Sequence, residues 1–230
     1  MTPSRLRKVS FEVLSGLALA VLAIILFGWI AEEMMENDTA HFDAFVRTQA
    51  HALASPAFTR AMEIMSFVGS PIPVVVLTVI AAVSFWYRGY LPRAVTLAIA
   101  VAGAGILEFA LKLCFQRARP VPFFDIPAPH SYSFPSGHAL GALCFYGMLA
   151  HEMTAVTDRR ALQWLLWMVA VIMILVIGFS RIYLGVHYPS DVVAGYVAGV
   201  VWLMAMILAE REFPKWRHRR GEEKGVLKHV

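Results

Sequence analysis

Long apolar runs alternate with short polar segments along most of the chain. A helix needs about 20 mostly apolar residues to cross a bilayer. Six runs reach this length or come close to it, and the second is the shortest. We expect the spans at about 11–31, 72–86, 94–113, 137–150, 162–179 and 192–209. Because helices satisfy their own backbone groups in lipid, the pattern predicts an all-α, six-transmembrane-helix bundle in one integral-membrane domain, residues 1–230.

The first apolar run could instead be a secretory signal peptide, because Arg5, Arg7 and Lys8 precede it. The apolar core of a signal peptide is about 7–15 residues long, and this run is longer. No persuasive cleavage site follows it. We therefore interpret 11–31 as a retained span.

The first outer loop, residues 32–70, begins with acidic residues and then becomes amphipathic. Its apolar positions are spaced as on helices that lie at a membrane surface. They are Phe42, Phe45, Leu53, Phe58 and Met62. The segment therefore predicts one or two interfacial helices, although a plain packed connector would give a similar pattern.

Residue composition excludes a soluble enzyme. Hydrophobic residues make up 59% of the chain and charged residues 16%. A soluble domain holds about 45–50% apolar and about 25% charged residues, because it needs a polar surface. The only two cysteines, Cys114 and Cys144, cannot form a disulfide framework, and Cys144 lies well inside a predicted span.

Basic residues set the expected orientation. If the N-terminus is cytoplasmic, most of the 20 Lys and Arg residues fall on the inner side, as is typical of membrane proteins. Both termini are then cytoplasmic, and the basic tail, 211–230, is placed to contact anionic lipids. Nucleic-acid binding is a poor interpretation, because the basic residues are split among short loops. The pattern gives no indication of the oligomeric state.

Several charged residues depart from this rule, since they lie at span ends on the outer side. Charges at membrane depth are rare and usually functional. They belong to three polar clusters, two of which follow the third and fifth spans and so share one face. The clusters are Lys112, Arg117 and Arg119; then Ser136, Gly137 and His138; then Ser180, Arg181, His187 and Asp191.

The chemistry of these clusters predicts a site for a phosphate-like dianion. Lys112, Arg119 and Arg181 are three cations without an equal number of nearby acids, and the planar arginine side chain matches phosphate oxygens. Ser136 and Gly137 open a predicted helix, where free N–H groups favour an anion. The less favoured alternative is that Ser136 is a simple helix cap.

Two histidines suggest catalysis rather than binding alone. One can attack phosphorus while the other protonates the departing oxygen. Asp191 follows His187 by four residues and can hold its second ring nitrogen. A metal site at His187 and Asp191 is disfavoured, because no third ligand has matching spacing and the three cations would repel the ion.

Two further residues are candidates for supporting roles. Glu108 lies one helical turn before Lys112, so the two can pair and orient the lysine. Arg117 could contact either the substrate or solvent and lipid headgroups.

The three clusters resemble the motifs of the type 2 phosphatidic acid phosphatase (PAP2) superfamily. The matching patterns are Lys-x6-Arg-Pro at 112–120, Pro-Ser-Gly-His at 135–138 and Ser-Arg-x5-His-x3-Asp at 180–191. The resemblance covers about residues 60–210. It points to the bacterial integral-membrane branch, which includes phosphatidylglycerophosphate, undecaprenyl pyrophosphate and lipid A phosphatases.

The resemblance implies a role for each matching residue. His187 would be the nucleophile that forms a phosphohistidine, supported by Asp191, and His138 would protonate the leaving group. The phosphate would be held by Lys112, Arg119, Ser136, Gly137 and Arg181, with Ser180 in the pocket or orienting its neighbours. Such enzymes need no metal and no cofactor.

The resulting expectation is a lipid phosphate or pyrophosphate phosphatase of the bacterial inner membrane, with its active site on the periplasmic side. Its substrate would be phosphatidylglycerophosphate, phosphatidic acid or undecaprenyl pyrophosphate. The alternatives are a lipid A phosphatase or phosphotransferase on the same scaffold and, in a different class, a non-catalytic lipid-phosphate binder or a transporter.

Overall fold

The computed structural model describes residues 3–127 and 130–226, with side-chain surroundings for residues 14, 16–127 and 130–210. These residues form eight helices and no strand, which confirms the all-α class. The helices are α1 (Pro3–Met35), α2 (Ala40–His51), α3 (Pro56–Val68), α4 (Pro71–Tyr87), α5 (Leu91–Phe115), α6 (Gly137–Thr154), α7 (Arg160–Tyr183) and α8 (Pro189–Val226).

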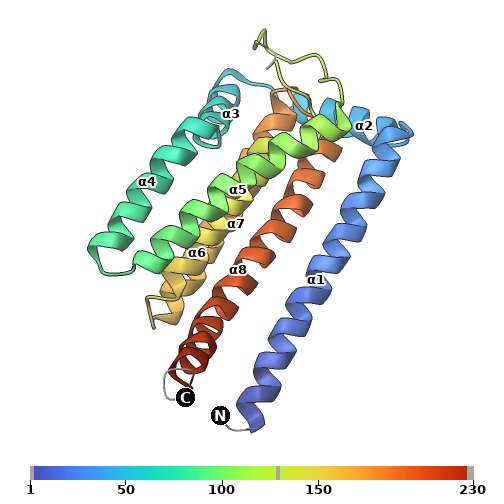
Figure 1. The fold of residues 1–230 in the computed structure, drawn as a ribbon. Coiled ribbons are helices and arrows are strands. Elements are labelled where there is room, and N and C mark those ends of the chain that lie inside the picture. Colours follow the sequence, from blue (N-terminus) through green and yellow to red (C-terminus); the bar gives the residue numbers. More distant parts are fainter. Residues whose placement is uncertain (1–2, 128–129, 227–230) are drawn as a thin grey trace.

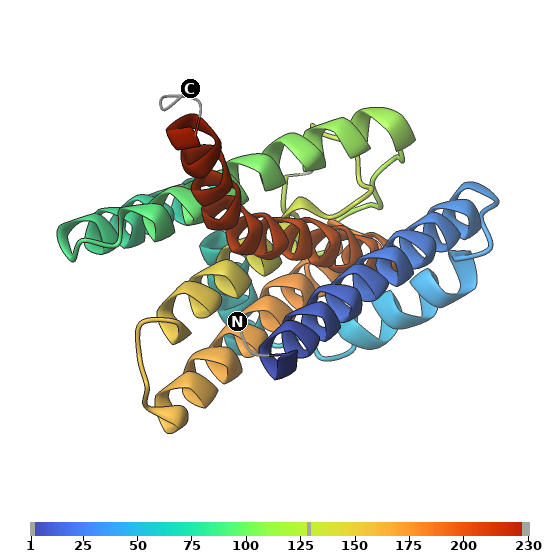
Figure 2. The ribbon, with the colours of Figure 1, turned by 60° about the horizontal axis from the view of Figure 1, so that its bottom comes forward.

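Helix α6 lies at the centre of the bundle and packs against α5, α7 and α8. Figure 2 shows α4 and α5 on one side of α6, α7 and α8, and α1 and α2 on the other side. Small residues on α6, including Ala139, Ala142 and Cys144, are completely buried. Small side chains let neighbouring helices approach closely, which is how helices pack in a membrane.

Proline marks the start of several helices. Pro56, Pro71 and Pro189 are the first residues of α3, α4 and α8. Proline is favoured there because its missing N–H would have no partner within the helix and its backbone angle is already helical. Helix α3 packs against α7. Helix α8 begins at Pro189, directly after the loop that holds His187.

Four helices are long and apolar enough to cross a membrane: α1 from Gly16, α5, α7 and the part of α8 up to Glu210. A fifth span results if α3 and α4, which are bent by 56° relative to each other, count as one. Helix α6 is less apolar, because it carries two histidines and a glutamate, so the expected count of six spans is not confirmed and stays a prediction. The chain is therefore a multi-pass membrane protein. The segment 32–70 holds two helices, α2 and α3, where one or two were expected.

The glutamate of α6 forms a buried ion pair at the end of the bundle where α5 begins. The Glu152 carboxylate is 0% exposed and accepts a hydrogen bond from Arg93 of α5 at 2.6 Å. A buried pair contributes little net stability, but removing one partner leaves an uncompensated charge.

We expect Arg93→Met to lower the stability of the protein by about 3 kcal/mol, because it leaves the Glu152 charge buried and unpaired. Thermal unfolding of the protein in detergent measures this. The control is Arg60→Met, which breaks the exposed Arg60–Glu63 pair and should change stability by less than about 1 kcal/mol. Equal losses in the two variants would contradict the expectation.

Candidate functional site

One end of the bundle gathers polar residues from separate segments around a cavity of about 320 Å³. The cavity lies where α5 and α7 end and where α6 and α8 begin, away from the end where the first turns of α1 and the last turns of α8 lie (Figure 1). The predicted residues that line it are Glu108, Lys112, Arg119, Gly137, His138, Arg181 and His187. The structure thus brings the three sequence clusters together.

His187 lies in the loop before α8, and its side chain is 1% exposed. Its Nε2 atom is 2.9 Å from Nη1 of Arg119. An arginine side chain can only donate, so Nε2 is the acceptor and we assign the ring proton to Nδ1. Nδ1 is 3.3 Å from Oδ2 of Asp191 and 3.4 Å from Oγ of Ser133. This tautomer directs the unprotonated nitrogen towards Arg119 and the cavity.

Asp191 lies behind His187, in the first turn of α8, and is 0% exposed. Its Oδ2 accepts hydrogen bonds from Ser133 Oγ at 2.5 Å and from the Tyr188 amide at 2.9 Å. Its Oδ1 accepts from Nη1 of Arg117 at 2.7 Å. The start of a helix also favours a negative charge. Asp191 is therefore held rigidly as a carboxylate facing His187.

Arg119 is fixed by backbone carbonyl oxygens. Its guanidinium donates to Ser131 O at 2.7 Å and to Val186 O at 2.8 Å. These contacts join the segment 116–136 to the loop that carries His187. They also orient the Arg119 guanidinium towards His187. Its positive charge is not neutralised, because neither partner is an acid.

Arg181 of α7 is held from a different helix, by a hydrogen bond to the Ser66 hydroxyl of α3. Its Nε has no partner within the described residues, and neither has the buried hydroxyl of Ser136, next to the cavity-lining Gly137. Buried polar groups without partners are rare in folded proteins. Arg181 Nε and the Ser136 hydroxyl are therefore donors to which a bound anion could supply the missing hydrogen-bond acceptor.

Lys112 and Glu108 form an ion pair of 2.7 Å on the last turns of α5. The pair holds the ammonium group at the cavity wall. Gly137, the first residue of α6, faces the same carboxylate, and a Cβ atom there would overlap with it. Glycine at this position therefore lets α5 and α6 approach closely enough to close the cavity.

His138 lines the cavity from the first turn of α6. Unlike His187, it makes no hydrogen bond within the part of the chain that the structure describes. It is therefore available to a bound group.

Two predicted residues have surroundings that the sequence did not indicate. The Ser180 hydroxyl donates to Ile177 O of its own helix at 2.6 Å, and Ser180 is not among the residues that line the cavity. Arg117 was left open between substrate and solvent, but it lies inside the protein and bridges two carboxylates, those of Asp191 and Asp43.

Several residues of the site were not predicted, among them Asp43 of α2, Ser66 of α3, and Ser133. Each binds a charged side chain of the site from a distant part of the sequence. The only available signal was for Asp43, which is the single acid of α2. Ser66 and Ser133 look like ordinary polar residues.

The loop carrying His187 depends on Gly185. Its φ angle is +74°, which side chains disfavour, and a Cβ atom there would lie 2.6 Å from the amide nitrogen of Phe123. The Phe123 amide donates to Leu184 O at 3.0 Å. Glycine thus lets the segment 116–136 pack directly on this loop.

Burial sets the protonation state of His187. It lowers the pKa of His187 to about 4, and the charges of Arg119 and Arg181 add to this, while Asp191 opposes it. The pKa of Arg119 is also lowered by burial, although the acids Asp191 and Glu108 counteract the effect. His187 is therefore a neutral base at neutral pH, beside charged arginines.

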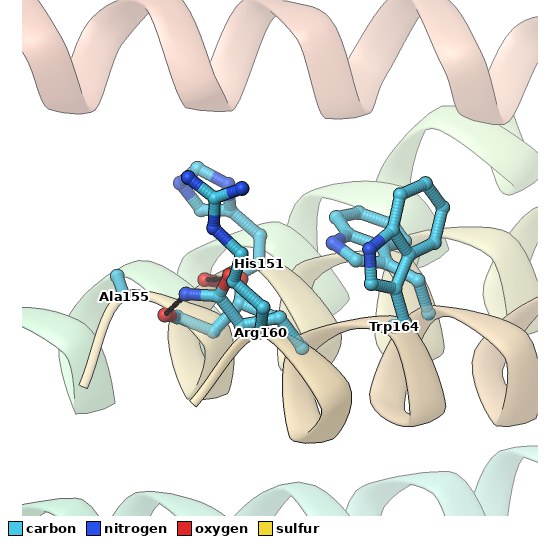
Figure 3. A pocket seen from close by; sticks show the side chains of 7 residues that line it. His151, Ala155, Arg160 and Trp164 are labelled. Atoms are coloured by element: carbon cyan, nitrogen blue, oxygen red, sulfur yellow. Dashed lines mark hydrogen bonds between the residues drawn. The ribbon is translucent and has the colours of Figure 1, made fainter. Parts of the chain in front are cut away.

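The described residues contain no group of three or more His, Cys, Asp or Glu side chains that could hold a metal ion. A different hollow, of about 480 Å³, lies at the opposite end, where α6 turns into α7. Figure 3 shows His151, Arg160 and Trp164 around it. His151 is paired there with Glu210 at 3.1 Å. This hollow lacks the paired histidines of the first cavity.

Comparison with known proteins places these features in a family. The sequence profile of the PAP2 superfamily matches residues 93–214. Phosphatidylglycerophosphatase B of Bacillus subtilis is 25% identical over 204 residues, which cover 86% of this chain and 98% of that protein. An undecaprenyl-diphosphatase of Sulfolobus acidocaldarius is 33% identical over 110 residues. That match covers 46% of this chain and about half, 49%, of the relative.

A solved structure has the same fold. The crystal structure of a transmembrane PAP2-type phosphatidylglycerolphosphate phosphatase from Bacillus subtilis superposes with a TM-score of 0.78. The match covers 84% of this chain and 96% of that one, at 24% identity. All three motifs lie within the region that the family profile matches.

We expect His187 to stay neutral down to about pH 5, because its pKa is near 4 rather than near 6.5 as in an exposed histidine. Since the folded-state pKa is the lower one, the unfolded chain binds the extra proton first. His187 should therefore reduce stability progressively as the pH falls from about 6.5 towards 4. Histidine ¹⁵N NMR, with His187→Gln to assign the signal, measures the titration. A midpoint near 6.5 would contradict this expectation.

Proposed function

Because the chain belongs to the PAP2 superfamily, we propose that it is a metal-independent phosphatase for membrane lipid phosphates or pyrophosphates that works through a phosphohistidine at His187. One observation carries the proposal. The unprotonated nitrogen of a buried histidine points towards a cavity that Lys112, Arg119 and Arg181 line. That arrangement combines a nucleophile with charges suited to a phosphoryl group.

Substrate binding follows from the charge balance. The cavity holds three cations and one acid, Glu108, so it favours an anion. Arginine side chains can bind phosphate oxygens through two parallel hydrogen bonds. Arg181 Nε and Ser136 Oγ supply donors that have no partner within the described residues. A bound phosphoryl group would compete with Nε2 of His187 for Arg119 and so free the nucleophile.

In the first step, Nε2 of His187 attacks phosphorus and a P–N bond forms. The bond from phosphorus to the oxygen of the leaving group breaks, and that oxygen takes a proton from His138. The leaving group is a lipid alcohol for a monoester or a lipid phosphate for a pyrophosphate. Asp191, bonded to Nδ1, stabilises the positive charge that develops on the imidazole ring.

In the second step, water replaces the departed lipid. His138, now unprotonated, takes a proton from the water as its oxygen attacks phosphorus. The P–N bond breaks, inorganic phosphate leaves, and His187 returns to its neutral state. The arginines and Lys112 stabilise the charge on the phosphoryl oxygens in both steps, which is the role that metal ions have in other phosphatases.

We place the site at the outer membrane surface, in a six-span topology with cytoplasmic termini in the bacterial inner membrane. In this arrangement residues 1–230 form one domain, and α2 and α3 lie at the outer interface. Arg160 in the hollow at the opposite end (Figure 3) supports the orientation, because arginine and lysine are enriched on the cytoplasmic side. Trp164 in the same hollow is typical of a membrane interface on either side. The basic residues of 211–230, proposed to contact anionic lipids, lie outside the described side chains.

A lipid substrate needs a route from the bilayer to His187. The cavity continues between α4 and α5, where Val74, Val75, Val101 and Gly105 line it. These residues are apolar, and α4 and α5 present further apolar side chains such as Ile72 and Ile106 to the outside. We propose that the acyl or prenyl chain of the substrate lies in this gap while the phosphate enters the charged end.

Purified protein in detergent should release phosphate from lipid phosphates in the presence of excess EDTA. The substrates to compare are phosphatidylglycerophosphate, phosphatidic acid and undecaprenyl pyrophosphate. His187→Ala should lower kcat by about 1000-fold or more, because no other group can take the role of the nucleophile. The matched control, His41→Ala, removes an exposed histidine of α2 and should retain activity. Activity that EDTA abolishes, or that survives in His187→Ala, would refute the mechanism.

Filling the gap between α4 and α5 should affect only long substrates. Gly105 faces open space, so Gly105→Leu is expected to raise KM for a long-chain lipid phosphate by about tenfold. Hydrolysis of a short, water-soluble phosphate ester should stay near the wild-type rate. Gly28→Leu is the control, since Gly28 is also an exposed helical glycine with free space but lies on α1. Equal effects on short and long substrates would argue against the route.

A further inference from the structure

We propose that Asp43 of α2 is a positioning residue for the reaction, which acts through Arg117 and Asp191 on the orientation of His187. The inference rests on the proposed function, because it concerns the same nucleophile. It goes beyond that function because Asp43 lies outside all three motifs and outside the region that the family profile matches, residues 93–214.

Arg117 joins the two acids directly. Its Nη1 donates to Oδ1 of Asp191 at 2.7 Å, and its Nη2 donates to Oδ2 of Asp43 at 2.9 Å. The two nitrogens of one planar group therefore bind two carboxylates from different helices. The guanidinium also lies 4.0 Å from the ring centre of Tyr188, which packs against its face. Arg117 also donates to the Ser190 hydroxyl at 2.8 Å, so the two acids, this serine and the Tyr188 ring together define its position.

Burial makes this arrangement sensitive to charge. Asp43 is 1% exposed, Asp191 is 0% exposed, and the Arg117 side chain is 12% exposed. Charges in such surroundings interact strongly because water does not screen them. Two carboxylates share one guanidinium, so the removal of Asp43 leaves Arg117 to pair with Asp191 alone. The attraction between the Asp191 carboxylate and the Nδ1 proton of His187 then becomes weaker.

Asp43 also contacts the helix that carries Asp191. Its Oδ1 accepts from the Ser190 amide at 2.9 Å and its Oδ2 accepts from the Ser190 hydroxyl at 2.7 Å. The amide belongs to the first turn of α8, where N–H groups lack partners within the helix. Asp43 thus caps α8 from another helix, one residue before Asp191, and holds the backbone of Asp191 as well as its side chain.

The remaining charged groups around His187 do not replace this link. Arg119 and Arg181 lie on the cavity side, and Arg47 of α2 donates to the carbonyl oxygens of Val121 and Gly185. Arg117 is the residue whose charge reaches the buried side of Asp191. The chain Asp43–Arg117–Asp191–His187 is therefore a continuous series of hydrogen-bonded groups from α2 to the nucleophile.

The test compares Asp43→Asn with Glu152→Gln. Both changes neutralise a buried acid that pairs with an arginine, but Glu152 lies at the opposite end of the bundle. We expect Asp43→Asn to lower kcat by about 10- to 100-fold with KM changed less than about threefold, because the nucleophile is misplaced while the phosphate site stays intact. Glu152→Gln should keep kcat within about twofold of wild type. Similar kcat values in the two variants would overturn the proposal.

A double-mutant cycle tests whether Asp43 acts through Arg117. If it does, Asp43→Asn combined with Arg117→Gln should be no slower than Arg117→Gln alone. Independent effects that multiply in the double variant would show that Asp43 acts through its contacts with Ser190 and not through Arg117, and would refute the series of contacts.

A measurement without turnover separates this proposal from the proposed function. Histidine ¹⁵N NMR of the full chain in detergent reports which ring nitrogen of His187 carries the proton. We expect the Nδ1-protonated form in wild type and in Glu152→Gln, and a mixture of both tautomers in Asp43→Asn. If wild type releases no phosphate from any lipid but this pattern holds, the proposed function fails and the positioning role stands. An unchanged tautomer in Asp43→Asn refutes the positioning role.

Discussion

The structure depends on holding three like charges together at one end of an apolar bundle. Lys112, Arg119 and Arg181 repel one another and lose hydration when they are buried, so each requires its own support. The support comes from three different places: an acid one turn away, backbone carbonyl groups, and a serine on another helix. Neither Arg119 nor Arg181 is held by a carboxylate. The site therefore keeps a net positive charge, which a bound anion would offset.

The same constraint explains why the short helices α2 and α3 matter. Ser66 of α3 holds Arg181, and Asp43 of α2 holds Arg117 and the first turn of α8. Without these two helices, Arg181 would lose Ser66 and Arg117 would keep only Asp191 as an acidic partner. The segment 32–70 is thus more than a connector, because it supplies the polar partners that the apolar spans cannot carry.

Long apolar runs predicted the four helices that are long and apolar enough to cross a membrane, because spanning a bilayer imposes a length and a composition that are visible in sequence. The three motifs likewise located residues that line the cavity, among them Lys112, His138 and His187, because each motif is a local run of chemically distinctive residues. The sequence could not reveal the partners of those residues. Asp43 and Ser133 are common residue types whose roles arise only from packing between segments far apart in the chain. Ser180 shows the opposite case, because its place in a motif suggested a pocket residue and its hydroxyl instead binds its own helix.

The central position of α6 has a consequence for how the protein is made. During synthesis, a segment enters the bilayer readily when its own side chains are apolar, and charged residues oppose this step. Helix α6 carries His138, His151 and Glu152, and it lies against α5, α7 and α8. In the proposed topology it cannot rely on its own hydrophobicity, so its insertion is coupled to α5, which precedes it and supplies Arg93 for Glu152. In that topology, insertion of the bundle is expected to be cooperative around α6, and the helix whose first turn carries His138 is also the one that depends most on its neighbours.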